Sequence, residues 1–175
     1  MALKQLPNNL EAEESVLGAC FLSQNALQTA VENLEETDFF DNKNAKIFKA
    51  LQNLVEQKIP VDLTTVTSEL TKQNWLNEVG GVTYLTEVIQ FVPTAANIEY
   101  YIKEVLDSAL LRRLIETATD IATSRYEPKN SVNDILDSAE KKILTIAKNR
   151  KTSEFKSIQD VLVKTQADLE KLADL

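Results

Sequence analysis

Two long segments without an internal glycine or proline dominate the second half of this chain. The first runs from Ile98 to Tyr126 and repeats apolar residues at helical spacing, so at 1.5 Å per residue it predicts a helix of about 43 Å. A break follows at residues 127–130, after which Ser131 and Asp134 form an N-terminal capping pattern. Apolar residues then recur at steps of three and four. Together, residues 97–147 predict a long antiparallel helical hairpin.

The first arm of this hairpin carries more apolar surface than one partner helix can cover. A surface helix needs a single apolar face, whereas large side chains here surround more than one. We expect the uncovered side to pack on the hairpin of a second copy. The alternative is that both sides pack on the chain's own head domain. The residues expected at the dimer interface are Ile98, Ile102, Val105, Leu111, Leu114, Val132, Leu136 and Ile143.

Residues 1–96 predict a small globular helical head, which makes the expected fold class all-α. Only 6% of the 175 residues are aromatic and only 3 are glycine, which favours helices over strands joined by tight turns. Asn8 and Asp62 are the expected N-caps of two head helices. Gly18 inside the first helix predicts a close crossing by another helix, and the Gly80-Gly81 pair predicts a turn with positive φ.

The C-terminal part predicts a polar linker over residues 148–154, followed by an amphipathic linker helix over residues 155–175. The linker contains no apolar residue. The helix repeats apolar residues at steps of three and four, which favours docking into a groove on another polypeptide. Its expected docking residues are Phe155, Ile158, Leu162, Leu169 and Leu172.

The composition argues against catalysis within this chain. There is no histidine and only one cysteine, Cys20, which excludes histidine-based nucleophilic chemistry and multi-cysteine metal sites. Three glycines are too few for a phosphate-binding loop. The carboxylates Glu11, Glu13 and Glu14 fall in the first turn of a helix, where acids complement the helix dipole, so we expect a solvated helix start there. We therefore predict no catalytic, cofactor or metal site.

Charge is distributed unevenly along the chain. Residues 1–100 contain 14 acidic and 6 basic residues, whereas residues 101–175 contain 13 of each. A negative head is repelled by phosphate, so its expected partners are proteins rather than nucleic acid. The absence of a long uncharged apolar stretch or a signal-peptide pattern predicts a cytoplasmic protein without a membrane span.

Several motifs in fixed order resemble the N-terminal region of bacterial or phage DnaB-type replicative DNA helicases. They occur at residues 11–18, 38–40, 47–48, 60–66, 80–85 and 93–101, and continue through residues 112–115, 139–143 and 155–158. The resemblance therefore covers nearly the whole chain. One departure is that Asn44-Ala45 stands where the family often has His-Arg, which leaves the local contacts of that helix open.

The resemblance implies a role in assembly. Family hairpins pair between subunits, three dimers close into a hexameric collar, and a linker helix packs on the ATPase domain of the neighbouring subunit. The ATPase domain, which uses ATP and Mg²⁺ to unwind duplex DNA at the replication fork, would follow Leu175, so this chain would be a non-enzymatic fragment of the helicase. Primase would dock on the collar, and a helicase loader is a further expected partner.

The primase-contact candidates that follow from the resemblance are Glu11, Glu78, Tyr84, Ile115 and Ile121. Alternatively, Glu11 only caps a helix and the two isoleucines are hairpin core. Two other functions stay open at this point: a free-standing helical adaptor of a replication complex, and direct DNA binding by the head, which the charge distribution opposes.

Overall fold

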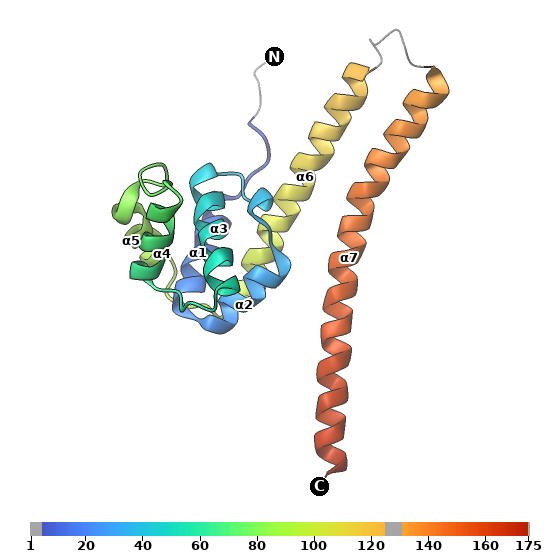
Figure 1. Cartoon of the computed structure of the whole chain (residues 1–175). Helices are drawn as coiled ribbons and strands as arrows, with labels where there is room; N and C mark the ends of the chain where they lie inside the picture. Colours follow the sequence, from blue (N-terminus) through green and yellow to red (C-terminus); the bar gives the residue numbers. More distant parts are fainter. Residues whose placement is uncertain (1–4, 125–130, 175) are drawn as a thin grey trace. The chain divides into compact units, whose positions relative to one another are not determined.

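The computed structural model describes residues 5–124 and 131–174, without the side chains of residue 124 and residues 150–161. Every regular element in these ranges is helical, which confirms the all-α fold class (Figure 1). In chain order the elements are α1 (Leu10–Leu22), α2 (Gln24–Asn33), the 3-10 helix η1 (Glu36–Asp38), α3 (Asn42–Glu56), α4 (Leu63–Lys72), α5 (Gly81–Phe91), α6 (Ile98–Ser124) and α7 (Val132–Ala173).

The chain divides into two compact units within the long helix α6. The first unit ends at Arg112 and the second begins at Arg113. The expected head ended at residue 96, so the first compact unit reaches further along the chain and includes the first turns of α6. The first unit is called the head below.

Helix α1 is the central element of the head and packs against α2, α3 and α5, while α3 also packs against α4 and η1. The crossing of α1 and α5 is close. A Cβ added to Gly18 would lie 2.6 Å from the carbonyl oxygen of Val88 and 3.0 Å from a methyl group of Val92. This confirms the expected helix crossing and gives the reason for a glycine in the interior of α1.

The helix caps lie at the residues expected from the sequence, except that the N-cap of α1 is one residue later. Asp62 and Thr65 form the capping box at the start of α4, and Ser131 accepts a hydrogen bond from the backbone N–H of Asp134, as predicted. Gly80 and Gly81 have φ of 92° and 68°, which confirms the expected turn. The N-cap of α1 is Asn9 rather than Asn8, because the Asn9 side chain accepts from the N–H of Ala12 at 3.0 Å.

The first part of α6 belongs to the hydrophobic core of the head. Ile98, Ile102 and Val105 are buried there together with the core residues of α1, α3 and α5. Their predicted place at an interface between subunits is therefore wrong, and for this stretch the alternative of packing on the chain's own head is right. Apolar spacing shows that a helix face is covered, but it does not show which neighbour covers it.

Helix α7 runs without a break from Val132 to Ala173. The expected polar linker over residues 148–154 is therefore helical. The prediction that the chain leaves the helix between the hairpin arm and the linker helix is wrong. The reason is local. Residues 131–175 contain neither glycine nor proline, and the lysine, arginine and glutamate of this stretch are good helix formers.

Candidate protein-interaction surfaces

The outer side of α6 carries a row of exposed apolar side chains, which we call the α6 stripe. Its members are Leu111, Leu114, Ile115, Ala118 and Ala122. Leu111 and Leu114 are 48% and 45% exposed. At about 100° of rotation per residue, the members fall within a sector of roughly 100°. Leu111 and Leu114 thus stay available as predicted interface residues.

Helix α7 presents further large apolar side chains to solvent. Val132, Leu136 and Ile143, the predicted interface residues on this arm, are 73%, 55% and 49% exposed. The apolar residues of this arm that are partly buried are instead Ile135, Ala139 and Ile146. Nearer the C-terminus, Leu162, Leu169 and Leu172 are exposed, whereas the side chains of Phe155 and Ile158 lie outside the described residues. Apolar surface on this scale is typical of a protein-binding surface.

A buried carboxylate lies between α1 and the start of α3. Glu13 is only 1% exposed, and its side chain accepts hydrogen bonds from the backbone N–H of Phe40 at 2.8 Å and of Asp41 at 3.3 Å. A third bond comes from the Asn44 side-chain amide at 3.1 Å. Burial raises the pKa of Glu13, and the three hydrogen bonds and the charge of Arg112 oppose that rise. The expectation of a solvated acidic helix start is therefore wrong for Glu13.

Asn44 joins this carboxylate to Tyr84 on α5. The Tyr84 hydroxyl donates to the side-chain oxygen of Asn44 at 2.6 Å, with a Glu14 carboxylate oxygen 3.3 Å away as a second acceptor. The Lys43 ammonium lies 5.3 Å from the centre of the Tyr84 ring. Tyr84 is consequently half-buried, and burial is the main cause that raises its pKa. The unusual Asn44-Ala45 pair was the one sequence signal of this connection.

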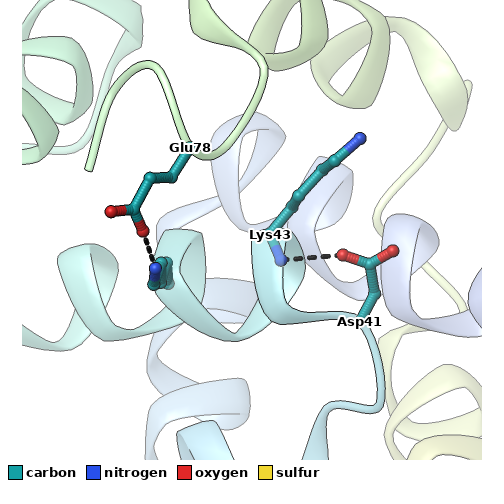
Figure 2. A network of polar contacts seen from close by, with 4 residues as sticks. Asp41, Lys43 and Glu78 are labelled. Atoms are coloured by element: carbon teal, nitrogen blue, oxygen red, sulfur yellow. Dashed lines mark hydrogen bonds and ion pairs between the residues drawn. The ribbon is translucent and has the colours of Figure 1, made fainter.

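A second set of polar contacts links the chain before α5 to α3. Glu78, which is exposed, forms an ion pair with Lys46, and the Asp41 side chain accepts from the backbone N–H of Lys43 at 2.7 Å as the N-cap of α3 (Figure 2). Figure 2 shows the Glu78 side chain pointing towards α3. Glu78 thus stays accessible to a partner while it is held by Lys46.

Arg112 ties the end of the buried part of α6 to two other segments of the head. Its guanidinium donates to the carbonyl oxygen of Pro7 at 2.9 Å and to that of Asp38 at 2.8 Å, and it lies 5.4 Å from the centre of the Phe40 ring. Arg112 is 7% exposed. In the sequence Arg112 stands out only as part of a motif, and its structural role depends on Pro7 and Asp38, which are distant along the chain.

The five primase-contact candidates occupy different environments. Glu11 is exposed in the first turn of α1, and Glu78 and Tyr84 lie in the head as described above. Ile115 is exposed and Ile121 is half-buried, and both belong to the second compact unit. The structure therefore divides the candidates between two units, with Glu11, Glu78 and Tyr84 in the first and Ile115 and Ile121 in the second.

The residues that the structure describes contain neither a membrane-spanning helix nor a metal-binding cluster. None of the helices in the described ranges is long and apolar enough to cross a membrane. Among the same residues, no group of three or more His, Cys, Asp or Glu is placed to hold a metal ion. Cys20 is buried in the head, and burial raises the pKa of its thiol to about 12.

The chain is similar in sequence to proteins of known identity. The DnaB-like helicase N-terminal domain family matches residues 5–107. The chain is 49% identical over 166 residues to the replicative DNA helicase DnaC of Bacillus subtilis, and 44% identical over 166 residues to the replicative DNA helicase DnaB of Geobacillus stearothermophilus. Each match covers 95% of this chain but 37% of the relative.

Two solved structures have the same fold. The N-terminal domain of DnaB helicase from Mycobacterium tuberculosis is 36% identical with a TM-score of 0.77, over 81% of this chain and 99% of that one. The N-terminal domain of DnaB helicase from Helicobacter pylori, described together with its interactions with primase, is 23% identical with a TM-score of 0.59, over 67% and 91% of the two chains. The chain thus spans a little over a third of the length of the curated helicases it matches, and it belongs to the family of DnaB-like helicase N-terminal domains.

Proposed function

We propose that this chain is the oligomerisation and primase-interaction region of a hexameric, ATP-dependent replicative DNA helicase. The observation that carries the proposal is the exposed apolar surface along α6 and α7, which a single copy of the chain leaves open to solvent. The relatives that match the chain over 95% of its length are replicative DNA helicases, which supports this reading over a free-standing adaptor.

Self-assembly is the first part of the proposed function. Leu111 and Leu114 of the α6 stripe and the exposed Val132, Leu136 and Ile143 of α7 form the contact between two copies. Burying large apolar side chains of this kind favours association, because it removes apolar surface from water. Three such dimers then close into the collar of the hexamer.

Docking of the end of α7 is the second part. Leu162, Leu169 and Leu172 are each more than half exposed, and they recur at helical spacing on a segment whose remaining side chains are largely polar. An amphipathic helix of this kind binds by laying its apolar face into a groove. The groove belongs to the ATPase domain of the neighbouring subunit.

Primase binding is the third part. Glu11 and Glu78 offer exposed carboxylates on the acidic head, and Ile115 offers an exposed apolar side chain on α6. The Tyr84 hydroxyl is occupied by Asn44, so Tyr84 contributes the accessible part of its ring. Ile121 is half-buried and contributes less surface than Ile115. A helicase loader is a further partner of the same collar.

ATP and Mg²⁺ act in the parent helicase, and this chain's own residues do not fit them. Gly18 is used in a helix crossing, and Gly80 and Gly81 form the turn before α5. No glycine is left for a loop that wraps phosphate groups. Unwinding of duplex DNA therefore requires the ATPase domain, and the whole assembly acts in the cytoplasm.

Sedimentation equilibrium of the chain and of two charge variants tests the assembly. We expect wild-type protein to self-associate, and Leu114→Asp to weaken association by about 100-fold, because a charge would be buried in the interface. Thr123→Asp adds the same charge to an exposed position outside the α6 stripe and should leave association unchanged. A wild-type chain that stays monomeric would overturn the assembly proposal.

Titration with Bacillus subtilis primase, followed by calorimetry, tests the second partner. Glu78→Ala and Ile115→Ala should each weaken binding, whereas Glu32→Ala, which removes an exposed carboxylate from α2, should not. If all three variants bind primase with the affinity of the wild type, Glu78 and Ile115 are not contact residues. No binding by the wild-type chain would contradict the primase role itself.

A further inference from the structure

The charge of α7 changes sign part-way along the helix. Residues 132–140 contain three acidic residues and no basic one, whereas residues 141–153 contain five basic residues and no acidic one. The helix runs through both segments without a break. A negative and a positive segment therefore follow each other directly on one continuous helix, with the boundary between Glu140 and Lys141.

Five residues around this boundary form a symmetric pattern on one side of α7, which we call the α7 charge row. Counted from Leu144, two acidic residues lie four and seven positions before it, and two lysines lie four and seven positions after it. At about 100° of rotation per residue, all five fall within a sector of roughly 80°. The members are Asp137, Glu140, Leu144, Lys148 and Lys151.

The α7 charge row is exposed to solvent. Asp137, Glu140 and Lys148 are exposed, and Leu144 is 56% exposed. The side chain of Lys151 lies outside the described residues. The row can therefore meet another molecule along its described length.

The row also borders the apolar surface that we assign to self-assembly. Leu136, one of the proposed interface residues, is turned by only about 40° from Glu140. The partly buried side of this part of α7 points elsewhere, since Ala139 is turned by about 140° from Leu144. A partner that covers the exposed apolar residues of α7 thus reaches the charge row as well.

Within a single copy, the row places like charges next to each other. Residues three positions apart are neighbours on a helix, and like charges at such a spacing are destabilising. Asp137 and Glu140 form one such pair, and Lys148 and Lys151 form the other. The other helical neighbours of Glu140, at three and four positions, are apolar. The pattern is therefore unfavourable for an isolated helix, and a partner with the opposite order of charges would relieve it.

A second copy of α7 that runs in the opposite direction has this opposite order. In an antiparallel pair with its two-fold axis at Leu144, each residue before Leu144 faces the residue equally far after it in the other copy. Glu140 then faces Lys148, Asp137 faces Lys151, and the symmetry repeats both contacts. A parallel pair in register would instead place each charge beside the same charge of the other copy, which is repulsive.

We propose that the α7 charge row forms an antiparallel contact with the same row of a second copy, centred on Leu144. The inference rests on the proposed self-assembly, for which it names the direction and the register of the two α7 helices. Exposed ion pairs each add little to affinity. Their effect here is to select the antiparallel direction, because the parallel arrangement brings like charges together.

Charge reversal in the whole chain, followed by sedimentation equilibrium, tests the contact. Glu140→Lys and Lys148→Glu each replace an ion pair by a repulsion at two symmetric places, so each should weaken association about tenfold. The double variant Glu140→Lys/Lys148→Glu restores opposite charges and should associate as the wild type does. Higher ionic strength should reduce the difference between the wild type and the single variants, because exposed charges are screened.

Lys142→Glu is the matched control for these variants. Lys142 is exposed and is turned by about 160° from Leu144, so the substitution makes the same change of charge outside the row. It should leave association unchanged. Circular dichroism establishes that each variant keeps its helix content.

Cross-linking between two kinds of chain measures the direction of the helices. Chains with Glu140→Cys are mixed with chains with Lys148→Cys and treated with a short bismaleimide, and mass spectrometry identifies the linked positions. The native Cys20 is buried and does not compete. Antiparallel pairing should link position 140 mainly to position 148, whereas parallel pairing would link identical positions.

The possible results distinguish this inference from the proposed function. Association that both single variants leave unchanged, a double variant that does not recover, or links mainly between identical positions would each overturn the antiparallel contact and leave self-assembly intact. A wild-type chain that stays monomeric contradicts the proposed assembly itself, and the antiparallel contact with it.

Discussion

At the scale of single residues, the head depends on polar groups that the hydrophobic pattern does not reveal. Glu13 and Asn44 are each 1% exposed, and both are fully used: the carboxylate accepts three hydrogen bonds, and the amide donates to Glu13 while accepting from Tyr84. A buried polar group is tolerated only when its bonds are satisfied. This pair therefore specifies how α1, α3 and α5 fit together.

The raised pKa of Glu13 predicts a pH dependence of stability. In the folded chain the pKa lies above its ordinary value of 4.5, so above that pH the native state holds more protons than the unfolded state. The slope of the unfolding free energy with pH is then negative. The contribution of Glu13 is fully present below pH 4.5 and is lost as the pH rises through the folded-state pKa.

Urea unfolding of wild-type and Glu13→Gln protein over a series of pH values measures this effect. We expect the stability of the wild type, relative to the variant, to decrease as the pH rises from 4.5. Glutamine does not titrate, so effects of the other ionisable groups cancel in the difference. A difference that stays level or grows with pH would contradict a raised pKa.

Lys58 occupies an unfavourable backbone conformation at the end of α3. Its φ is 57°, and its N–H bonds to the carbonyl of Val55 while that of Ile59 bonds to Leu54, which is the pattern of a Schellman motif. Left-handed backbone geometry costs a residue with a Cβ about 1–2 kcal/mol, and glycine avoids this cost. Part of the gain is lost, because glycine gives up more conformational entropy on folding than other residues do. Lys58→Gly should therefore stabilise the chain by about 0.5–1 kcal/mol in urea unfolding.

The preceding residue provides the matched control for this substitution. Gln57 has φ of −80° and needs no glycine, so Gln57→Gly should destabilise the chain by about 0.5–1 kcal/mol. If both substitutions shift stability in the same direction, the conformation of Lys58 is not the cause.

At the scale of elements, α6 and α7 show how one helix can serve several neighbours. The first turns of α6 complete the core of the head, and its later turns expose the α6 stripe. Helix α7 crosses a wholly polar stretch without ending, because nothing in that stretch terminates a helix. Change of composition along a chain therefore marks a change of environment and does not by itself mark the end of an element.

Proline substitution tests the continuity of α7. Asn149 lies in the helix interior, so Asn149→Pro removes a backbone hydrogen bond and clashes with the preceding turn, at a cost of about 3 kcal/mol. We expect a clear loss of helix signal in circular dichroism. Val132→Pro is the control, since the first residue of a helix accepts proline. Equal spectra for both variants would mean that residues 148–154 are not helical.

At the scale of the whole molecule, charge decides which partners are excluded. The net charge of −8 is concentrated in residues 1–100, which hold 14 acids against 6 bases. Basic side chains are also partly engaged, as Lys46 is in an ion pair with Glu78. Binding to DNA requires cations that neutralise phosphate groups, and the acidic head opposes it.

A gel-shift experiment with single-stranded DNA tests this exclusion. We expect no retardation of the oligonucleotide by the chain at low ionic strength, where electrostatic attraction is strongest. A parallel native gel without DNA, stained for protein, follows binding of the chain to the purified primase of Bacillus subtilis as the positive control. Retardation that disappears as salt is raised would show phosphate contacts and would reopen direct DNA binding by the head.

Much of the architecture could be predicted from local sequence. The start of α4 at Asp62, the start of α7 at Ser131 and the positive φ at Gly80 and Gly81 depend on the nearest few residues. The close approach at Gly18 was also predictable, because a glycine within an apolar helix usually has a packing reason. These features follow from backbone sterics and from hydrogen bonds over three or four residues.

The places of the candidate site residues required the tertiary structure. Ile98 and Leu111 are both apolar and belong to one helix, yet the first lies in the core of the head and the second is exposed. Glu11 and Glu13 are two residues apart, yet only Glu13 is buried and bonded to the turn before α3. Helical spacing determines which residues share a face. Only the packing of segments distant in sequence decides what that face meets, because burial and hydrogen bonding depend on neighbours that the local pattern does not name.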